Sequence, residues 1–600
     1  MNARQLIVFA VAAWGVGTAY VLAAQEISSV AAMPAQEAPS VKRRPVPRKE
    51  MLARFADEFE IDCLVHFGPN TVYDREWGYG DENPMLFNPV NLDADKIVEQ
   101  CKAAGIRGLT FVAKHHDGFC LWPTKTTEHN ITKSPWKGGK GDIVREFADA
   151  CRRGGIKFGI YVSPWDRNNA HYGTDKYPAI YHEQWRELAS GEYGLLYQGW
   201  FDGANGGDGY YGGAYEVRTH ENGFDYYDIK GVAEKLKAWN PGIVFMSGGD
   251  GVCDLRWPCN EEGYCDPDAR AGFNAVGDPV TPGWGHYERG DINGSLFVQP
   301  CCDFPQNPGW FYHEDYAPLT RPPLYMMQLY LRSVGHGGVM QIGIAPRKDG
   351  ALSPVDAANL KEFGEIRAKF FSNKVAEGSF DAGGGEAEIA GKGDFNVIVL
   401  RENLSKGEQI DGWELWLDRK DGTSERLVNG ISVGVKRIRT LPRKVAGEKL
   451  RFVVTASAGQ PQDVTFRLYD ADPSLVEQVW AAKKPVLPRY QMARQTYAKG
   501  LTLMWDYVTP LTFSRFILDP QPGADAAQAP ASGKISFSLD GQSWFGEMTV
   551  RLGNVAANPI PQKFVTSKPM EVRYVKLVAD RTISGTGDVV LRGFGARPRK

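Results

Sequence analysis

Between residues 55 and 370, short apolar runs alternate with amphipathic segments, and this alternation constrains the fold more than any other feature of the chain. Runs such as IDCLVHF (61–67) and GLTFVAK (108–114) have the composition of buried strands. Segments such as DADKIVEQCKAAG (93–105) and GDIVREFADACRRGG (141–155) have the pattern of helices, and each ends in Gly, a common helix stop. The alternation therefore indicates an α/β domain with a parallel sheet.

Seven or eight such strand–helix units predict a TIM-type (β/α)8-like barrel over residues 51–371. A doubly wound sheet is the alternative, but no Gly-rich phosphate-binding turn follows the first strand. Helical patterns then give way to short alternating strands with turn signals. They predict a β-sandwich over 372–478, a linker over 479–493, and a second all-β jelly-roll module over 494–600.

The N-terminus has the pattern of a secretory signal. A basic Arg4, an apolar run and small residues near Ala24 predict a signal peptide over residues 1–24, followed by a Pro- and charge-rich spacer over 25–50. An uncleaved membrane anchor is the alternative. We expect a secreted or periplasmic protein with no membrane association after cleavage. The net charge of −3 gives no indication of a nucleic-acid partner, and the oligomeric state is left open.

The chain has nine cysteines, an odd number that leaves at least one thiol unpaired or bonded to another chain. Five of them cluster in two segments that we expect to be loops: Cys253, Cys259, Cys265, Cys301 and Cys302. One or two disulfides are plausible there, and a zinc site is the weaker alternative because the spacing matches no zinc-binding pattern.

Polar and aromatic residues recur where the predicted strands end. They are His66, Lys114, His115, His116, Tyr161, Ser163, Trp165, Trp200 and Asp202, and the loop CDLRWPCNEEG (253–263) follows the fifth strand. Any one of these residues at a strand end would be ordinary. Polar groups at five consecutive strand ends indicate a polar ligand, because buried polar groups are costly without a hydrogen-bond partner. The sequence contains no HxH or HExxH motif that would indicate a metal site, and we expect no cofactor.

Several motifs together resemble the alpha-L-fucosidases of glycoside hydrolase family 29. They are HFGPNT, REWGYGDENPMLFNP, AKHHDGFCLWP, GWFDGANG, RWPCNEEG and PGWFYH. The forms WFDGA and RWxxNE are similar to the branch that acts on alpha-1,3/1,4-linked fucose. The last module resembles discoidin-type carbohydrate-binding domains. The resemblance implies a retaining exo-glycosidase with a fucosylated oligosaccharide or glycoconjugate as its partner.

By motif, the resemblance assigns Asp202 as the nucleophile and Glu261 as the acid/base. The implied sugar contacts are His66, Glu76, Trp77, His115, His116, Tyr161, Trp200, Arg256 and Trp310. Because neighbouring side chains of an extended segment point in opposite directions, only one glutamate of the pair Glu261–Glu262 is expected to face the sugar. The resemblance to the family motif selects Glu261.

The sequence departs from the family pattern at QPCCDFPQN (299–307), where Cys301 stands in the place of a family carboxylate. This departure leaves two alternatives open besides an active fucosidase. One is the same fold with a shifted sugar or linkage specificity, and the other is a catalytically idle carbohydrate-binding protein.

Overall fold

The computed structural model of the 600-residue chain describes residues 44–220, 223–246, 252–274, 285–520, 523–552 and 561–598. The expected signal peptide and most of the spacer lie outside these residues, so both stay predictions. Among the described residues, no helix has the length and apolar character needed to cross a membrane.

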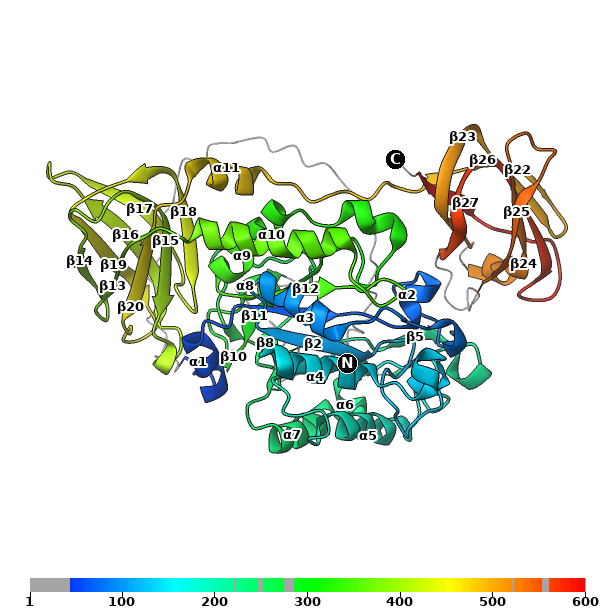
Figure 1. The fold of residues 1–600 in the computed structure, drawn as a ribbon, viewed down its shortest axis with the longest axis horizontal. Coiled ribbons are helices and arrows are strands. Elements are labelled where there is room, and N and C mark those ends of the chain that lie inside the picture. The colour runs from blue at the N-terminus through cyan, green and yellow to red at the C-terminus, as the bar shows by residue number, and fades with distance from the viewer. Residues whose placement is uncertain are drawn as a thin grey trace, which may run out of the picture. The chain divides into compact units, whose positions relative to one another are not determined.

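Eight parallel strands close into a barrel in the order β1-β12-β11-β8-β7-β4-β3-β2, which confirms the predicted fold class (Figure 1). The strands are β1 (Ile61–Val65), β2 (Gly108–Lys114), β3 (Lys157–Val162), β4 (Gln198–Trp200), β7 (Val244–Met246), β8 (Leu255–Arg256), β11 (Gln299–Pro305) and β12 (Val339–Ile344). Nearly every strand residue is buried, as in a parallel sheet covered on both faces.

The helices that follow the strands begin and end where the sequence signals indicate. They include α3 (Ala94–Ala103), α4 (Ile143–Gly154), α5 (Tyr177–Ala189), α7 (Ile229–Trp239), α9 (Pro323–Ser333) and α10 (Pro354–Phe370). Asp93 caps α3 and Asp142 caps α4, each by accepting a hydrogen bond from a backbone N–H of the first turn. Gly155 ends α4 with a φ of 69°, a left-handed conformation that glycine adopts without steric cost.

Two barrel strands differ from the expected positions. The sixth barrel strand is the two-residue β8, and the segment with Glu261 follows this strand and not the fifth one. Asp202 follows β4, so one strand, β7, lies between β4 and β8 in the barrel. The apolar segment SLFVQ (295–299), whose pattern predicts a strand, forms the short β10 (Leu296–Phe297) outside the barrel, and only its last residue, Gln299, belongs to a barrel strand. The barrel instead uses β11, which carries both adjacent cysteines. Short strands lack enough periodicity to be located from sequence alone.

The C-terminal part consists of antiparallel sheets, as predicted. Two four-stranded sheets, β13-β20-β15-β18 and β14-β19-β16-β17, pack over a shared core. Their strands are β13 (Lys374–Phe380), β14 (Gly384–Glu388), β15 (Phe395–Glu402), β16 (Ile410–Asp418), β17 (Ser424–Gly430), β18 (Arg437–Val445), β19 (Lys449–Ser457) and β20 (Val464–Tyr469). The alternation of buried and exposed residues in β16 and β20 is typical of strands with one buried face.

Helix α11 (Pro473–Ala481) follows, and then a larger antiparallel sheet in the order β21-β27-β23-β26-β24-β25, with β22 paired to β23. Its strands are β21 (Gln491–Met492), β22 (Arg494–Lys499), β23 (Thr502–Asp519), β24 (Pro530–Ser538), β25 (Phe545–Arg551), β26 (Gln562–Thr582) and β27 (Gly593–Pro598). This sheet has its own apolar core, separate from that of the sandwich. The sandwich also packs on the barrel, since Val397 and Val399 of β15 and Ile438 of β18 belong to the apolar cluster of the barrel.

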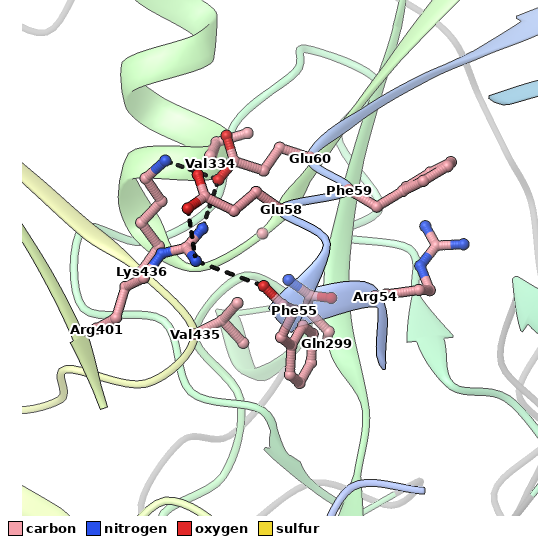
Figure 2. Close-up of a pocket in the computed structure, with 11 residues that line it drawn as sticks. Arg54, Phe55, Glu58, Phe59, Glu60, Gln299, Val334, Arg401, Val435 and Lys436 are labelled. Atoms are coloured by element: carbon pink, nitrogen blue, oxygen red, sulfur yellow. Dashed lines mark hydrogen bonds and ion pairs between the residues drawn. The ribbon is translucent and has the colours of Figure 1, made fainter. Parts of the chain in front are cut away.

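A polar pocket joins the barrel to the β-sandwich (Figure 2). Glu60, just before β1, accepts hydrogen bonds from Lys436 at 2.7 Å and from Arg401 at 2.8 Å. The two cations hold the pKa of Glu60 below its usual value, although burial alone would raise it. Because Glu60 precedes β1 and His66 follows it, this pocket lies at the end of the barrel opposite the strand-end histidines. It anchors the sandwich and is not the catalytic site.

Candidate active site

The structure gathers most of the expected site residues at the carboxyl ends of the barrel strands. His66 follows β1, and its ring centroid lies 5.0 Å from that of Trp310 and 5.5 Å from that of His115. Tyr161 in β3 stacks near Trp200 of β4, with ring centroids 5.1 Å apart. These residues come from segments far apart in the chain, and only closure of the barrel brings them together.

Asp202 lies two residues beyond β4, and its carboxylate accepts two short hydrogen bonds. The hydroxyl of Tyr161 donates to Oδ2 at 2.6 Å, and the backbone N–H of Ala204 donates to Oδ1 at 2.8 Å. His116 Nε2 lies 3.9 Å from Oδ2. The side chain is 25% exposed, so it remains accessible to a ligand. Donors on both oxygens hold the carboxyl group in one orientation.

The three histidines of the site are uncharged at neutral pH. Burial lowers the pKa of His66 to about 3 and that of His116 to about 4, and it also lowers the pKa of His115. The Nδ1 atom of His116 is 2.7 Å from Ser163 Oγ, which fixes the ring and leaves Nε2 toward Asp202. Neutral imidazoles can exchange hydrogen bonds with sugar hydroxyls without competing for the charge of the carboxylate.

Glu261 is the second carboxyl of the site, and its backbone has a positive φ of 50°. The residue as a whole is exposed at the edge of the site, yet its carboxyl group is desolvated by the protein atoms around it. Desolvation by these surroundings is the main cause that raises its pKa to about 7; a hydrogen bond with Trp310 opposes the shift, and the charge of Asp202 adds to it. The two carboxyls therefore interact, and Glu261 retains its proton in slightly acidic solution.

The neighbouring Glu262 has a different environment. Its carboxylate accepts a hydrogen bond from Lys484 at 2.6 Å and lies 3.8 Å from Arg321. This ion pair attaches the loop to the segment after α11. Glu262 is thus paired within the protein, and the expectation that only Glu261 faces the sugar stays a prediction.

Glu76 belongs to a hydrogen-bonded chain that sequence reasoning did not identify. Trp310 N donates to Glu76 Oε2 at 2.7 Å, His313 Nε2 contacts Glu76 Oε1, and His313 Nδ1 lies 2.7 Å from Asp74 Oδ1. The two carboxylates raise the pKa of His313 although burial opposes the shift. His313 ends the motif PGWFYH, and its position three residues after Trp310 is the signal that could have identified it.

Aromatic rings form part of the wall of the site. Trp77 is 44% exposed, and its ring meets those of His116 and Trp165 edge to face at 5.6 and 5.7 Å. Trp200 is buried, and its Nε1 donates to Gln341 at 3.0 Å. Exposed Trp77 is thus able to cover an apolar part of a ligand, whereas Trp200 is held within the barrel.

Arg256 does not join this group. It is fully buried, and its guanidinium donates to the backbone carbonyls of Tyr287 at 2.8 Å and Arg270 at 2.7 Å, with a further contact to Val298 O. The predicted sugar contact by Arg256 therefore has no support in this geometry. From β8 the side chain instead ties together the backbone at Arg270, Tyr287 and Val298.

The adjacent cysteines lie within β11 and not in a loop, and Cys259, Cys265, Cys301 and Cys302 are free thiols, so the expected disulfides do not form among these four. Cys302 clusters with Cys265, whereas Cys301 belongs to the barrel-interior cluster, as alternation in a strand requires. Asp303, next in β11, is a buried carboxyl that sequence reasoning missed. Burial and the charge of Glu261 raise its pKa well above the usual value. Its place at the end of a barrel strand is the signal that identifies it.

Asp202, held by two hydrogen-bond donors, and Glu261, whose pKa is raised, stand at the carboxyl ends of the barrel strands, which is the arrangement of a barrel glycoside hydrolase. The alpha-L-fucosidase family model matches residues 61–369, which span the barrel. Alpha-L-fucosidase 1 of Arabidopsis thaliana is 31% identical over 436 residues, which cover 66% of this chain and 82% of the plant protein. A solved glycoside hydrolase 29 family member from an unknown rumen bacterium superposes with a TM-score of 0.68 at 30% identity, covering 93% of this chain and 100% of that one. The chain belongs to the alpha-L-fucosidases of glycoside hydrolase family 29.

Proposed function

We propose that the enzyme releases terminal alpha-L-fucose by double displacement with retention of anomeric configuration. Asp202 attacks the anomeric carbon and forms a glycosyl-enzyme, while Glu261 gives its proton to the leaving oxygen. Glu261 then takes a proton from water, which hydrolyses the intermediate. The observation that carries this proposal is the different environment of the two carboxyls: Asp202 accepts two short hydrogen bonds, whereas the pKa of Glu261 is raised to about 7.

The nucleophile is tested by Asp202→Gly with 2-chloro-4-nitrophenyl alpha-L-fucoside. We expect turnover to vanish, and added azide to restore phenol release with formation of the inverted beta-fucosyl azide, because the small anion occupies the space of the missing carboxylate. NMR of the product gives its anomeric configuration. Full activity of Asp202→Gly without azide contradicts the assignment, and retained activity of Glu261→Ala toward a glycan contradicts the acid/base role.

The proposed substrate is alpha-1,3/1,4-linked fucose on an oligosaccharide or glycoconjugate. The WFDGA and RWxxNE forms support this linkage, whereas the Cys301 replacement favours a shifted sugar or linkage as the second candidate. A panel of defined fucosylated oligosaccharides separates the two. Preferential cleavage of alpha-1,2- or alpha-1,6-linked fucose contradicts the proposed alpha-1,3/1,4 specificity. Sugar binding without turnover of any member identifies the idle binding protein.

We further propose an exported protein whose last β module binds glycans. The N-terminal apolar run supports export. The half-buried Trp544 offers an aromatic ring, but Lys576 lies 4.2 Å from its centroid and covers one face, which leaves the other face for a sugar. Trp544→Ala should weaken retention on an immobilised glycan without changing hydrolysis of a small aryl fucoside, and unchanged retention contradicts the assignment.

A further inference from the structure

Three ionisable side chains meet beneath the catalytic site and take no part in the proposed reaction. Glu82, Asp117 and His129 each offer one potential ligand atom, and these atoms lie within 4.8 Å of one another. Glu82 is 1% exposed, Asp117 2% and His129 9%. None of the three is among the expected sugar contacts, although Asp117 directly follows His116. The cluster is therefore a buried centre separate from the Asp202–Glu261 pair.

The cluster has unsatisfied acceptors. Asp117 Oδ2 and His129 Nε2 have no hydrogen-bond partner among the described residues, and neither does Asn70 Oδ1. Asn70 is fully buried, and its Nδ2 lies 3.4 Å from His115 Nδ1, which turns Oδ1 away from the histidine. A side-chain carbon built on Gly78 would come within 2.3 Å of Asn70 Oδ1 and 2.8 Å of Glu82 Oε1, so both oxygens face the same space. Buried acceptors without donors are costly unless a ligand satisfies them.

Negative charge in this centre is only partly balanced. Arg75 donates to Glu82 Oε1 at 3.0 Å, while the buried Lys114 is engaged by Asp166 at 3.2 Å. A proton shared between Glu82 and Asp117 would satisfy the carboxyls, but it would leave the His129 nitrogen and the Asn70 oxygen unpaired. One cation satisfies all of these groups.

We propose that Glu82, Asp117 and His129 bind one divalent transition-metal cation of the Zn²⁺ type. One imidazole nitrogen and two carboxylate oxygens form a mixed N/O donor set, which suits Zn²⁺ better than Ca²⁺, a cation that takes six to eight oxygen ligands. The spacing of the three ligand atoms suits one shared ion, and Asn70 Oδ1 supplies a further oxygen. The backbone N–H groups of Tyr79 and Gly80 orient the Glu82 carboxylate, at 2.6 and 2.8 Å.

The consequence of this site is structural. Glu82 lies in the loop that carries Glu76 and Trp77, and Asp117 lies next to His116. A shared cation fastens the loop to the end of β2 and so fixes the wall of the catalytic site. It takes no part in the displacement itself.

Metal analysis of the full chain tests the proposal. Protein with its purification tag removed is dialysed against chelator, given Zn²⁺, passed through gel filtration and assayed for zinc by mass spectrometry. We expect about one equivalent to remain bound and the unfolding temperature to rise by a few degrees, because a ligand of the folded state stabilises it. Co²⁺ in place of Zn²⁺ should give visible ligand-field absorption from the His129 environment.

Asp117→Asn and His129→Gln should lose the retained zinc, the thermal shift and the Co²⁺ absorption. The matched controls are Asp356→Asn and His336→Gln, which alter a buried carboxyl and a histidine outside the cluster and should keep all three. If the wild type retains no zinc, or if both cluster variants retain as much as the controls, the proposal is wrong. The wild-type measurements decide the matter even if a variant does not fold.

Discussion

At the scale of single residues, the hydroxyl of Tyr161 is the side-chain donor that holds the Asp202 carboxylate, at 2.6 Å. Tyr161→Phe removes this bond and leaves the ring in place. We expect kcat to fall about 10- to 100-fold with a smaller change in KM, since a hydrogen bond to a charged group contributes about 1.5–3 kcal/mol. Steady-state kinetics on an aryl fucoside measures kcat and KM separately. Tyr181→Phe, which removes a hydroxyl that donates to Val162 O at 3.2 Å, is the control and should retain near-wild-type kcat.

The pKa of Glu261, raised to about 7, sets an alkaline limb of activity. Glycosylation needs the protonated acid, so kcat/KM should be constant below this pKa and fall tenfold per pH unit above it. The site histidines have pKa values lowered by burial and stay neutral throughout this range. Glu261→Gln, assayed on an aryl fucoside whose leaving group needs little protonation, should lose the limb. If the alkaline fall in kcat/KM persists in Glu261→Gln, it reports the titration of another ionisable group and the prediction for Glu261 is wrong.

At the scale of elements, the loop between α2 (Pro69–Tyr73) and residue 82 depends on Gly80. Gly80 has a φ of 87°, and a side-chain carbon there would come within 2.4 Å of the Arg167 backbone, which cannot move aside. Gly80→Ala should lower the free energy of unfolding by about 1–3 kcal/mol and raise KM, because Glu76 and Trp77 lie in the same loop. Gly138→Ala, with φ 65° and open space, is the control for backbone strain alone. Equal KM values for the two variants would contradict this role.

Elements with strong periodicity could be predicted from the sequence, whereas short ones could not. The apolar runs of β1 and β2 and the capped helices α3 and α4 lie where the sequence predicts them, because burial and capping leave local signals. The two-residue β8 and the displaced β11 left none, since only closure of the barrel defines them. The same limit applies to the site: His66 and Asp202 follow recognisable strands, but the burial of Arg256 and the His313–Glu76 contact arise from pairings distant in the chain.

At the scale of the whole molecule, the last β module touches the network that holds Glu76. Arg515 in β23 donates to Asp74 Oδ1 at 2.6 Å, and Asp74 in turn contacts His313. Burial would raise the pKa of Asp74, but the bonds from His313 and Arg515 lower it to about 2. Lys563 of β26 also lowers the pKa of Glu76 through its charge. A module that only tethered the enzyme to a glycan would have no need of these contacts.

Arg515→Ala should therefore impair hydrolysis although the residue lies outside the barrel. Loss of the guanidinium leaves Asp74 with one cationic partner, so the Glu76–His313 pair is held less firmly in position. We therefore expect kcat/KM to fall about tenfold, mainly because KM rises. Arg515→Lys keeps the charge but not the paired donors and should recover part of the loss. Arg592→Ala removes a largely exposed arginine of the same module, 3.7 Å from Asp519, and should leave kinetics unchanged. If Arg515→Ala matches Arg592→Ala in KM on an aryl fucoside, the module acts on the glycan alone and does not support the catalytic site.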